Sequence, residues 1–190
     1  RRRRPRQSAL HPVGTRDPDT ATIYIVGELY GSNMLPAEIV SRVSAKDRSI
    51  QRDDGSGGIY AHGQILTGIL DSSAWDRVGV NQPNTEKVSR GDQMNAAGLQ
   101  WRPCKKWTGC REAGWQNIHR LLAPNERCPE RMPGLRVFPE CKNLIRTLPA
   151  VMRDLKNPED IKDGQDDHAC DALRSLLQYK DGGFALMRAG

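Results

Sequence analysis

The strongest hydrophobic pattern of this chain lies close to its C-terminal end. Apolar residues recur there at the i, i+3, i+4, i+7 and i+8 spacing of a buried helical stripe: Ala169, Ala172, Leu173, Leu176 and Leu177. The acidic stretch DGQDD over 163–167 runs directly into this stripe. His168 and Asp171 are three residues apart, so we expect them to lie together on one flank of an amphipathic helix.

The rest of the chain alternates between strand-like and helix-like segments. Strands are predicted for the β-branched and aromatic run over 23–30, the apolar run over 65–71 and the short run over 135–138. Helical spacing follows over 35–47, 86–97, 111–122 and 141–148. This alternation indicates an α/β fold with a mainly parallel central sheet flanked by helices. In the first strand we expect Ile25 and Leu29 on one face and Glu28 on the other.

Composition sets the size and the domain organisation. The 190 residues, 37% of them hydrophobic, suit one folded domain, which we expect over 20–180. The net charge of +6 suits an anionic partner such as nucleic acid, but the run RRRRPR at the start supplies five of the positive charges. We expect residues 1–19 to be a flexible basic arm and residues 181–190 a flexible tail.

Cysteine usage and hydropathy indicate the compartment. The five cysteines are an odd number without a CxxC pair, and Cys104 and Cys110 lack a matching pair of histidines, so a zinc site is not expected. Reduced thiols fit a reducing compartment. No apolar run approaches the ~18 residues of a membrane span, and nothing resembles a signal peptide. We therefore expect a soluble, intracellular protein that is not secreted.

Carboxylates mark the candidate chemistry. Asp71 closes the apolar run 65–71, and ligands of open α/β sheets collect at the carboxyl ends of strands. If the helix carrying Asp171 packs beside that end, two carboxylates could hold Mg²⁺, or two ions that clamp a phosphoryl displacement. His168 could then contact the phosphate or a metal-bound water. Two alternatives remain open: Asp71 as a simple helix cap, and Asp167 and its acidic neighbours as a solvated helix N-terminus.

Several other chemistries are excluded or disfavoured. There is no GxxxxGK[ST] loop, so we do not expect ATP hydrolysis, and there is no GxSxG nucleophile elbow. Cys170 lies between acidic residues, which disfavour a thiolate, so we interpret it as a core residue.

An ordered set of segments resembles the nuclease domain of bacteriophage terminase large subunits. The segments are ELYGSNMLP (28–36), the strand ending at Asp71 with SSAW after it, GDQMNAAGLQWRP (91–103), GWQNIHRLL (114–122), ECKNLIRTLPAVMRD (140–154) and NPEDIKDGQDDHACDALR (157–174). The resemblance covers roughly residues 23–179, and the DHxxDALR element is its strongest part.

That resemblance implies a ribonuclease H-like fold and an endonuclease that uses Mg²⁺ or Mn²⁺, with two ions. It implies cutting of concatemeric double-stranded viral DNA during packaging in the host cytoplasm, together with a terminase small subunit and a portal protein. Asp71 and Asp171 match the family's metal ligands and His168 its catalytic histidine, while Asp167 is a weaker ligand candidate. No ATPase domain accompanies these segments, so we expect no DNA translocation by this chain alone.

One departure concerns a further Asp that ribonuclease H-like nucleases carry on a first strand, ahead of residues 23–30. Residues 7–22 are poor in strand formers and offer no acid before Asp17, so that strand is truncated or rearranged, or Asp17, Asp19 or Glu28 substitutes. The alternative function is a catalytically impaired fragment that acts as a DNA-binding or portal-docking module. A resolvase or transposase of the same fold is disfavoured by the order of the motifs.

Basic and aromatic residues interleave between 101 and 120, a pattern that can serve nucleic-acid contact. The candidate DNA-binding residues are Lys105, Lys106, Arg111 and Arg120. The aromatic residues among them are Trp101, Trp107 and Trp115, and the last is expected in the core because it lies on a helical stripe.

Overall fold

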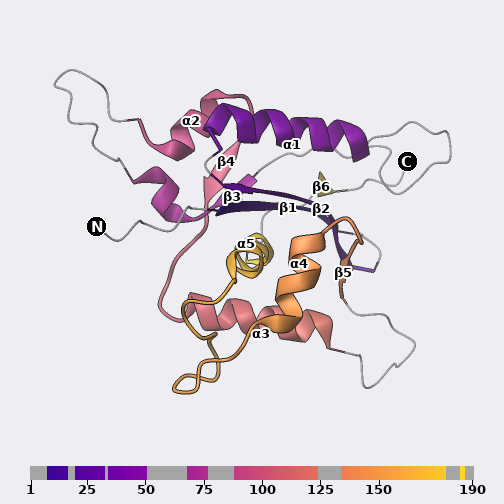
Figure 1. Ribbon diagram of the computed structural model, residues 1–190, viewed down its shortest axis with the longest axis vertical. Helices are drawn as coiled ribbons and strands as arrows, with labels where there is room; N and C mark the ends of the chain where they lie inside the picture. Colours follow the sequence, from indigo (N-terminus) through magenta and orange to yellow (C-terminus); the bar gives the residue numbers. More distant parts are fainter. Residues whose placement is uncertain are drawn as a thin grey trace.

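A four-stranded and a two-stranded sheet form the centre of the chain, with α-helices on both sides of the larger one (Figure 1). The computed structural model describes residues 8–16, 20–32, 34–50, 68–76, 88–123, 134–178 and 185–186. The larger sheet has the order β5-β2-β1-β6, and β3 pairs with β4 in the smaller one. The strands are β1 (Ser8–Arg16), β2 (Ile23–Ser32), β3 (Gly68–Leu70), β4 (Trp101–Pro103), β5 (Leu135–Val137) and β6 (Ala185–Leu186).

The predicted flexible arm over residues 1–19 is wrong in part, because Ser8–Arg16 forms β1. This strand pairs antiparallel with β2 along its whole length, from Ser8 opposite Ser32 to Arg16 opposite Ile23. Pairing with β2, which is rich in β-branched and aromatic residues, thus outweighs the weak strand propensity of the segment itself. The other pairings, β2 with β5, β1 with β6 and β3 with β4, are parallel. The sheet is therefore mixed, with its longest ladder antiparallel. Ala185 and Leu186 of the expected tail form β6, and the remainder of 181–190 lies outside the described residues.

A β-bulge in β2 corrects the predicted faces of that strand. Val13 pairs with Gly27 and Gly14 pairs with Ile25, so Val26 is an extra residue opposite β1. Because side chains alternate with a period of two, one extra residue exchanges the two faces beyond it. Leu29 consequently packs in a different hydrophobic cluster from Ile25, and Glu28 turns to the face of Ile25.

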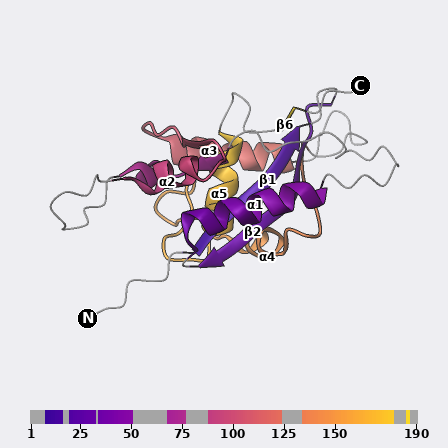
Figure 2. The same cartoon turned by 90° about the horizontal axis from the view of Figure 1, so that it is seen from above.

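The helices divide between the two faces of the larger sheet. Helix α1 (Pro36–Ile50) covers one face, while α3, α4 and α5 gather on the other (Figures 1 and 2). The helices other than α1 are α2 (Arg90–Ala96), α3 (Cys110–Leu122), α4 (Lys142–Thr147) and α5 (His168–Leu177), and the short 3₁₀ turns are η1 (Ser72–Trp75) and η2 (Leu148–Ala150). None of the helices in the described residues is long and apolar enough to span a bilayer.

Each face of the sheet has its own hydrophobic core. The core under α5 contains Ile25, Trp115, Leu144 and Leu173, and Ile69 of β3 packs against it. The core under α1 contains Ile39, Val43, Met94 and Trp101, and Leu70 of β3 packs against that one. Neighbouring residues of β3 thus reach opposite cores, as a strand with two covered faces does.

Candidate active site at the end of β3 and the start of α5

Asp71 lies at the point where β3 ends and the 3₁₀ turn η1 begins. Its Oδ1 accepts a hydrogen bond from the backbone N–H of Ser73 at 2.8 Å, which caps η1. The ammonium of Lys106 lies 3.1 Å from each carboxylate oxygen. Partial burial acts to raise the pKa of Asp71, but the bonds from Ser73 and Lys106 outweigh it, so the pKa is lowered. The cap interpretation is therefore confirmed, and a protein cation faces the carboxylate.

Asp171 lies in the first turn of α5, where the buried stripe fixes its direction. Ala169 and Leu173 on either side of it are buried, as the sequence predicts. The Asp171 side chain is 38% exposed and accepts a hydrogen bond from Nε of Arg174 at 3.1 Å. This acid, like the one at the end of β3, thus already has a cationic partner from the protein.

Asp167 and His168 begin the same helix. Asp167 is the N-cap residue, but its side chain makes no capping bond. Burial raises the pKa of Asp167, and the nearby negative charge of Asp171 raises it further. The side chain of His168 is exposed. The N-terminus of α5 is therefore an acidic, partly buried surface rather than a fully solvated one.

Packing brings the two acid-bearing elements into contact. Helix α5 packs against both β1 and β3, and Ile69 lies against the cluster that holds Ala169, Cys170 and Leu173. Asp71 follows β3 by one residue, and Asp171 lies in the α5 turn that supplies this cluster. Segments that are a hundred residues apart in the sequence thus pack against each other.

The described acids do not by themselves make a complete site for Mg²⁺ or Mn²⁺. Among the described residues, no three His, Cys, Asp or Glu side chains lie close enough together to hold an ion. Asp71 and Asp171 are each paired with a basic side chain instead. Asp17 and Asp19, which could supply a further ligand, lie outside the described residues. The described residues therefore bring at most two such side chains together at any one place.

Glu28 has a structural partner at some distance in sequence. Its carboxylate accepts hydrogen bonds from the backbone N–H groups of Asn143 and Leu144, at 2.6 and 3.0 Å, and from the Asn143 amide at 2.8 Å. A carboxylate at a helix N-terminus satisfies unpaired N–H groups and complements the helix dipole. Glu28 thus caps α4, a role that the sequence did not indicate because it depends on the bulge in β2.

The predicted DNA-binding residues are in different environments. Lys105 and Lys106 are exposed in the loop after β4, together with the half-exposed Trp107. Arg111 binds Asp160 at 2.7 Å, and this pair fixes the loop before α5. Arg120 bonds to a neighbouring residue of its own helix. Of these four residues, Lys106 forms an ion pair with a candidate catalytic acid, and Arg111 lies near enough to Asp171 for their charges to interact.

The remaining aromatic and thiol residues are structural. Trp101 and Trp115 are buried, so they belong to the core rather than to an open aromatic surface. Burial raises the pKa of the Cys170 thiol to about 11, and its sulfur contacts the hydroxyl of Thr147. This thiol stays protonated at neutral pH, which agrees with its interpretation as a core residue. Cys104, Cys110 and Cys141 form no disulfide with one another.

Comparisons with known proteins bear on the fold. No known family profile matches the chain, and no curated protein sequence matches it. Among solved structures, the nuclease domain of the P22 large terminase superposes with a TM-score of 0.56 at 12% identity, covering 93% of this chain and 83% of that one. The large terminase nuclease domain of bacteriophage SPP1 with bound Mn has a TM-score of 0.48 at 15% identity, covering 90% and 85%. The expected fold is thereby confirmed: the chain has the ribonuclease H-like α/β fold of a phage large terminase nuclease domain.

Proposed function

We propose that this chain is the nuclease domain of a phage terminase large subunit and that it cuts concatemeric double-stranded DNA during genome packaging. The observation that carries the proposal is the contact between β3, which ends at Asp71, and α5, whose first turn holds Asp171. The similarity of the fold over 93% of the chain supports it, as does the order of the motifs. The small subunit and the portal protein are the proposed partners.

The chain's own residues contribute position and charge. The bond from Ser73 N–H to Asp71 holds that carboxylate at the strand end, and helix packing holds Asp171. Lys106 is exposed and brings a positive charge to the same place, where a DNA phosphate could accept its hydrogen bonds. A divalent ion would supply activation of water, but the described residues lack a complete set of ligands for it.

Plasmid nicking in Mn²⁺ or Mg²⁺ tests this proposal. We expect Asp71→Asn and Asp171→Asn each to reduce nicking by about a hundredfold or more, because asparagine removes the charge of a group acting on the phosphodiester. Asparagine keeps the cap at η1, so loss of activity cannot be ascribed to unfolding of that turn. The matched control is Asp76→Asn, an exposed acid just after η1. Equal rates for Asp71→Asn and the wild type would remove Asp71 from the mechanism.

A second function, a non-catalytic DNA-binding or portal-docking module, is favoured by one observation. Asp71 and Asp171 are each paired with a basic side chain of the protein. No group of three potential metal ligands occurs in the described part of the chain. Calorimetric titration with Mn²⁺ separates the two functions. If the chain is a nuclease, it should bind Mn²⁺, and the affinity should fall in Asp71→Asn and Asp171→Asn. If it is a non-catalytic module, neither the wild type nor the variants should give a heat of Mn²⁺ binding.

A further inference from the structure

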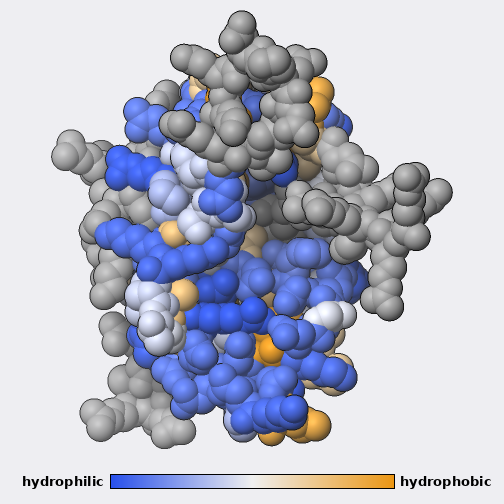
Figure 3. All heavy atoms as spheres, turned by 90° about the vertical axis from the view of Figure 1, so that its left-hand side faces the viewer, coloured by the Kyte–Doolittle hydropathy of each residue, from blue (hydrophilic) through white to orange (hydrophobic). Residues whose placement is uncertain are grey.

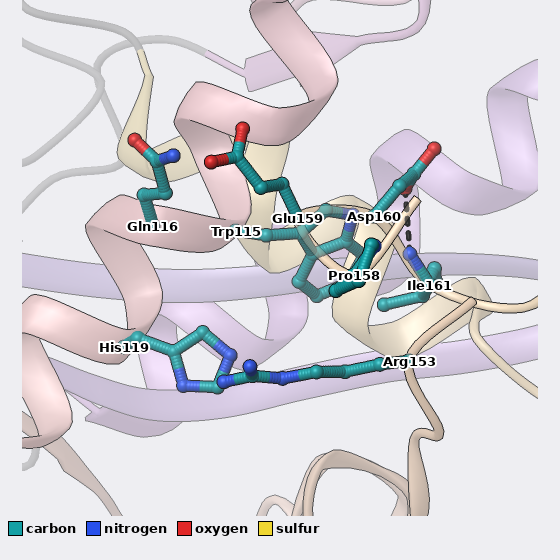
Figure 4. Close-up of a pocket in the computed structure, with 8 residues that line it drawn as sticks. All are labelled: Trp115, Gln116, His119, Arg153, Pro158, Glu159, Asp160 and Ile161. Carbon is teal, nitrogen blue, oxygen red and sulfur yellow. Dashed lines mark hydrogen bonds between the residues drawn. The ribbon is translucent and has the colours of Figure 1, made fainter. Parts of the chain in front are cut away.

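A preformed cavity of about 200 Å³ lies between α3 and the segment before α5 (Figure 4). Its walls are tied together by Arg111, whose Nε donates to Asp160 Oδ1 at 2.7 Å. The same oxygen accepts the backbone N–H of Ile161 at 2.7 Å, and Asp154 N–H bonds to the Asp160 carbonyl at 3.0 Å. These bonds fix the cavity wall independently of any ligand.

One side of the cavity carries cationic and imidazole groups. The His119 ring and the Arg153 guanidinium both lie there in Figure 4, one from α3 and one from the opposite wall. Both side chains are exposed, and neither makes a hydrogen bond or an ion pair with another described residue. The Arg153 guanidinium and the His119 imidazole therefore lie beside each other with donors that have no acceptor among the described residues, which suits a phosphate group.

The other side carries an amide and a carboxylate, across an apolar middle. Figure 4 shows Gln116 and Glu159 on that side, with Trp115 and Pro158 between the two sides. Trp115 is 4% exposed, and its indole N–H has no acceptor among the described residues. Ligand sites commonly combine such an apolar middle with a few polar groups that have no partner in the protein. The face drawn in Figure 3 is mainly hydrophilic in its lower half, with only a few apolar residues.

We propose that this cavity binds one nucleotide of single-stranded DNA. The phosphate lies between Arg153 and His119, the base lies against Pro158 and Trp115, and an amino group of the base donates to Glu159. The volume is below the ~300–1,000 Å³ of pockets that enclose drug-sized ligands, so the cavity takes one nucleotide at most, with part of it outside. A base in a duplex is stacked and paired, so only an unpaired strand can enter. The site goes beyond the proposed cutting activity, because it uses neither Asp71 nor Asp171.

Fluorescence anisotropy with labelled ten-nucleotide oligo-dC and oligo-dT, without divalent ions, tests the proposal. We expect oligo-dC to bind at least about fivefold more tightly, because cytosine has an amino group for Glu159 and thymine has none. Arg153→Ala should weaken both oligonucleotides about tenfold, since a charged hydrogen-bonding group is lost. Arg153→Lys, which retains the charge but not the planar fork, should recover only part of that affinity.

Two controls make the outcome decisive. Lys156→Ala removes one exposed positive charge from the same segment without touching the cavity, and it should change binding less than Arg153→Ala does. Glu159→Ala should abolish the preference for oligo-dC. Equal affinity for both oligonucleotides, equal losses in Arg153→Ala and Lys156→Ala, or no binding at all would each overturn the proposal.

Discussion

Replacing His11 with leucine is expected to make the protein less sensitive to acid. His11 lies in β1, is 9% exposed and packs edge-on against the Trp101 ring, with 5.2 Å between ring centroids. Its Nε2 has no hydrogen-bond partner among the described residues. Burial, together with the nearby charge of Arg90, lowers the pKa of His11 from 6.5 to about 4. The folded protein thus holds this imidazole in its neutral form.

The magnitude follows from the difference between the two pKa values. The unfolded chain binds a proton near pH 6.5 and the folded chain only near 4, so the unfolded state binds more protons between these values. His11 therefore contributes nothing to acid sensitivity above pH 6.5, and stability is lost as the pH falls towards 4. One pKa unit corresponds to about 1.4 kcal/mol, which gives a loss on the order of 2 kcal/mol between pH 7.5 and pH 5.

Urea unfolding at pH 7.5 and pH 5 measures this effect. The wild type should lose more free energy of unfolding between the two pH values than His11→Leu, by about 2 kcal/mol. Other titrating groups are common to both proteins and cancel in this comparison. If His11→Leu and the wild type lost the same free energy of unfolding between pH 7.5 and pH 5, the folded protein would not hold the His11 imidazole neutral.

Three further predictions concern single contacts. Glu28→Ala should lower the free energy of unfolding by about 1–3 kcal/mol in urea titrations, because it leaves N–H groups of α4 unpaired, and Glu28→Gln should cost less; equal losses would contradict the cap. Gly68→Ala should cost about 1–3 kcal/mol, since a Cβ there would lie 2.0 Å from the Trp101 ring, and an unchanged unfolding midpoint would refute this close packing. Lys106→Met should raise the pKa of Asp71 in a carbon-detected NMR titration, because one of the interactions that lower it is removed; an unmoved pKa would mean that the ion pair does not form in solution.

Local patterns were sufficient to predict several elements. The stripe of α5 is buried as its spacing indicated, because the helical period is a property of neighbouring residues. Trp115 lies in the core for the same reason. The strand 65–71 is confirmed over Gly68–Leu70, with Asp71 directly after it. In these cases the residues that determine the structure are close to one another in the sequence.

Other features depended on contacts between distant segments. Ser8–Arg16 has little strand character of its own, and it becomes a strand because β2 offers it a long ladder of hydrogen bonds. The pairing of Lys106 with Asp71 joins residues that are far apart in the chain, and the cavity walls likewise come from separate segments. The hydrophobic periodicity of the sequence does not predict which basic side chain pairs with which carboxylate.

The sequence by itself thus determined the helical stripe, the apolar strand and the order of acids that follow them, since each rests on short-range spacing. Tertiary structure decided which partner each acid has. An extra residue at the bulge in β2 turned Glu28 towards α4, and packing brought α5, which carries Asp171, against β3, which ends before Asp71. The physical reason is that side-chain direction and charge pairing depend on strand register and helix docking, which arise only when remote segments pack together.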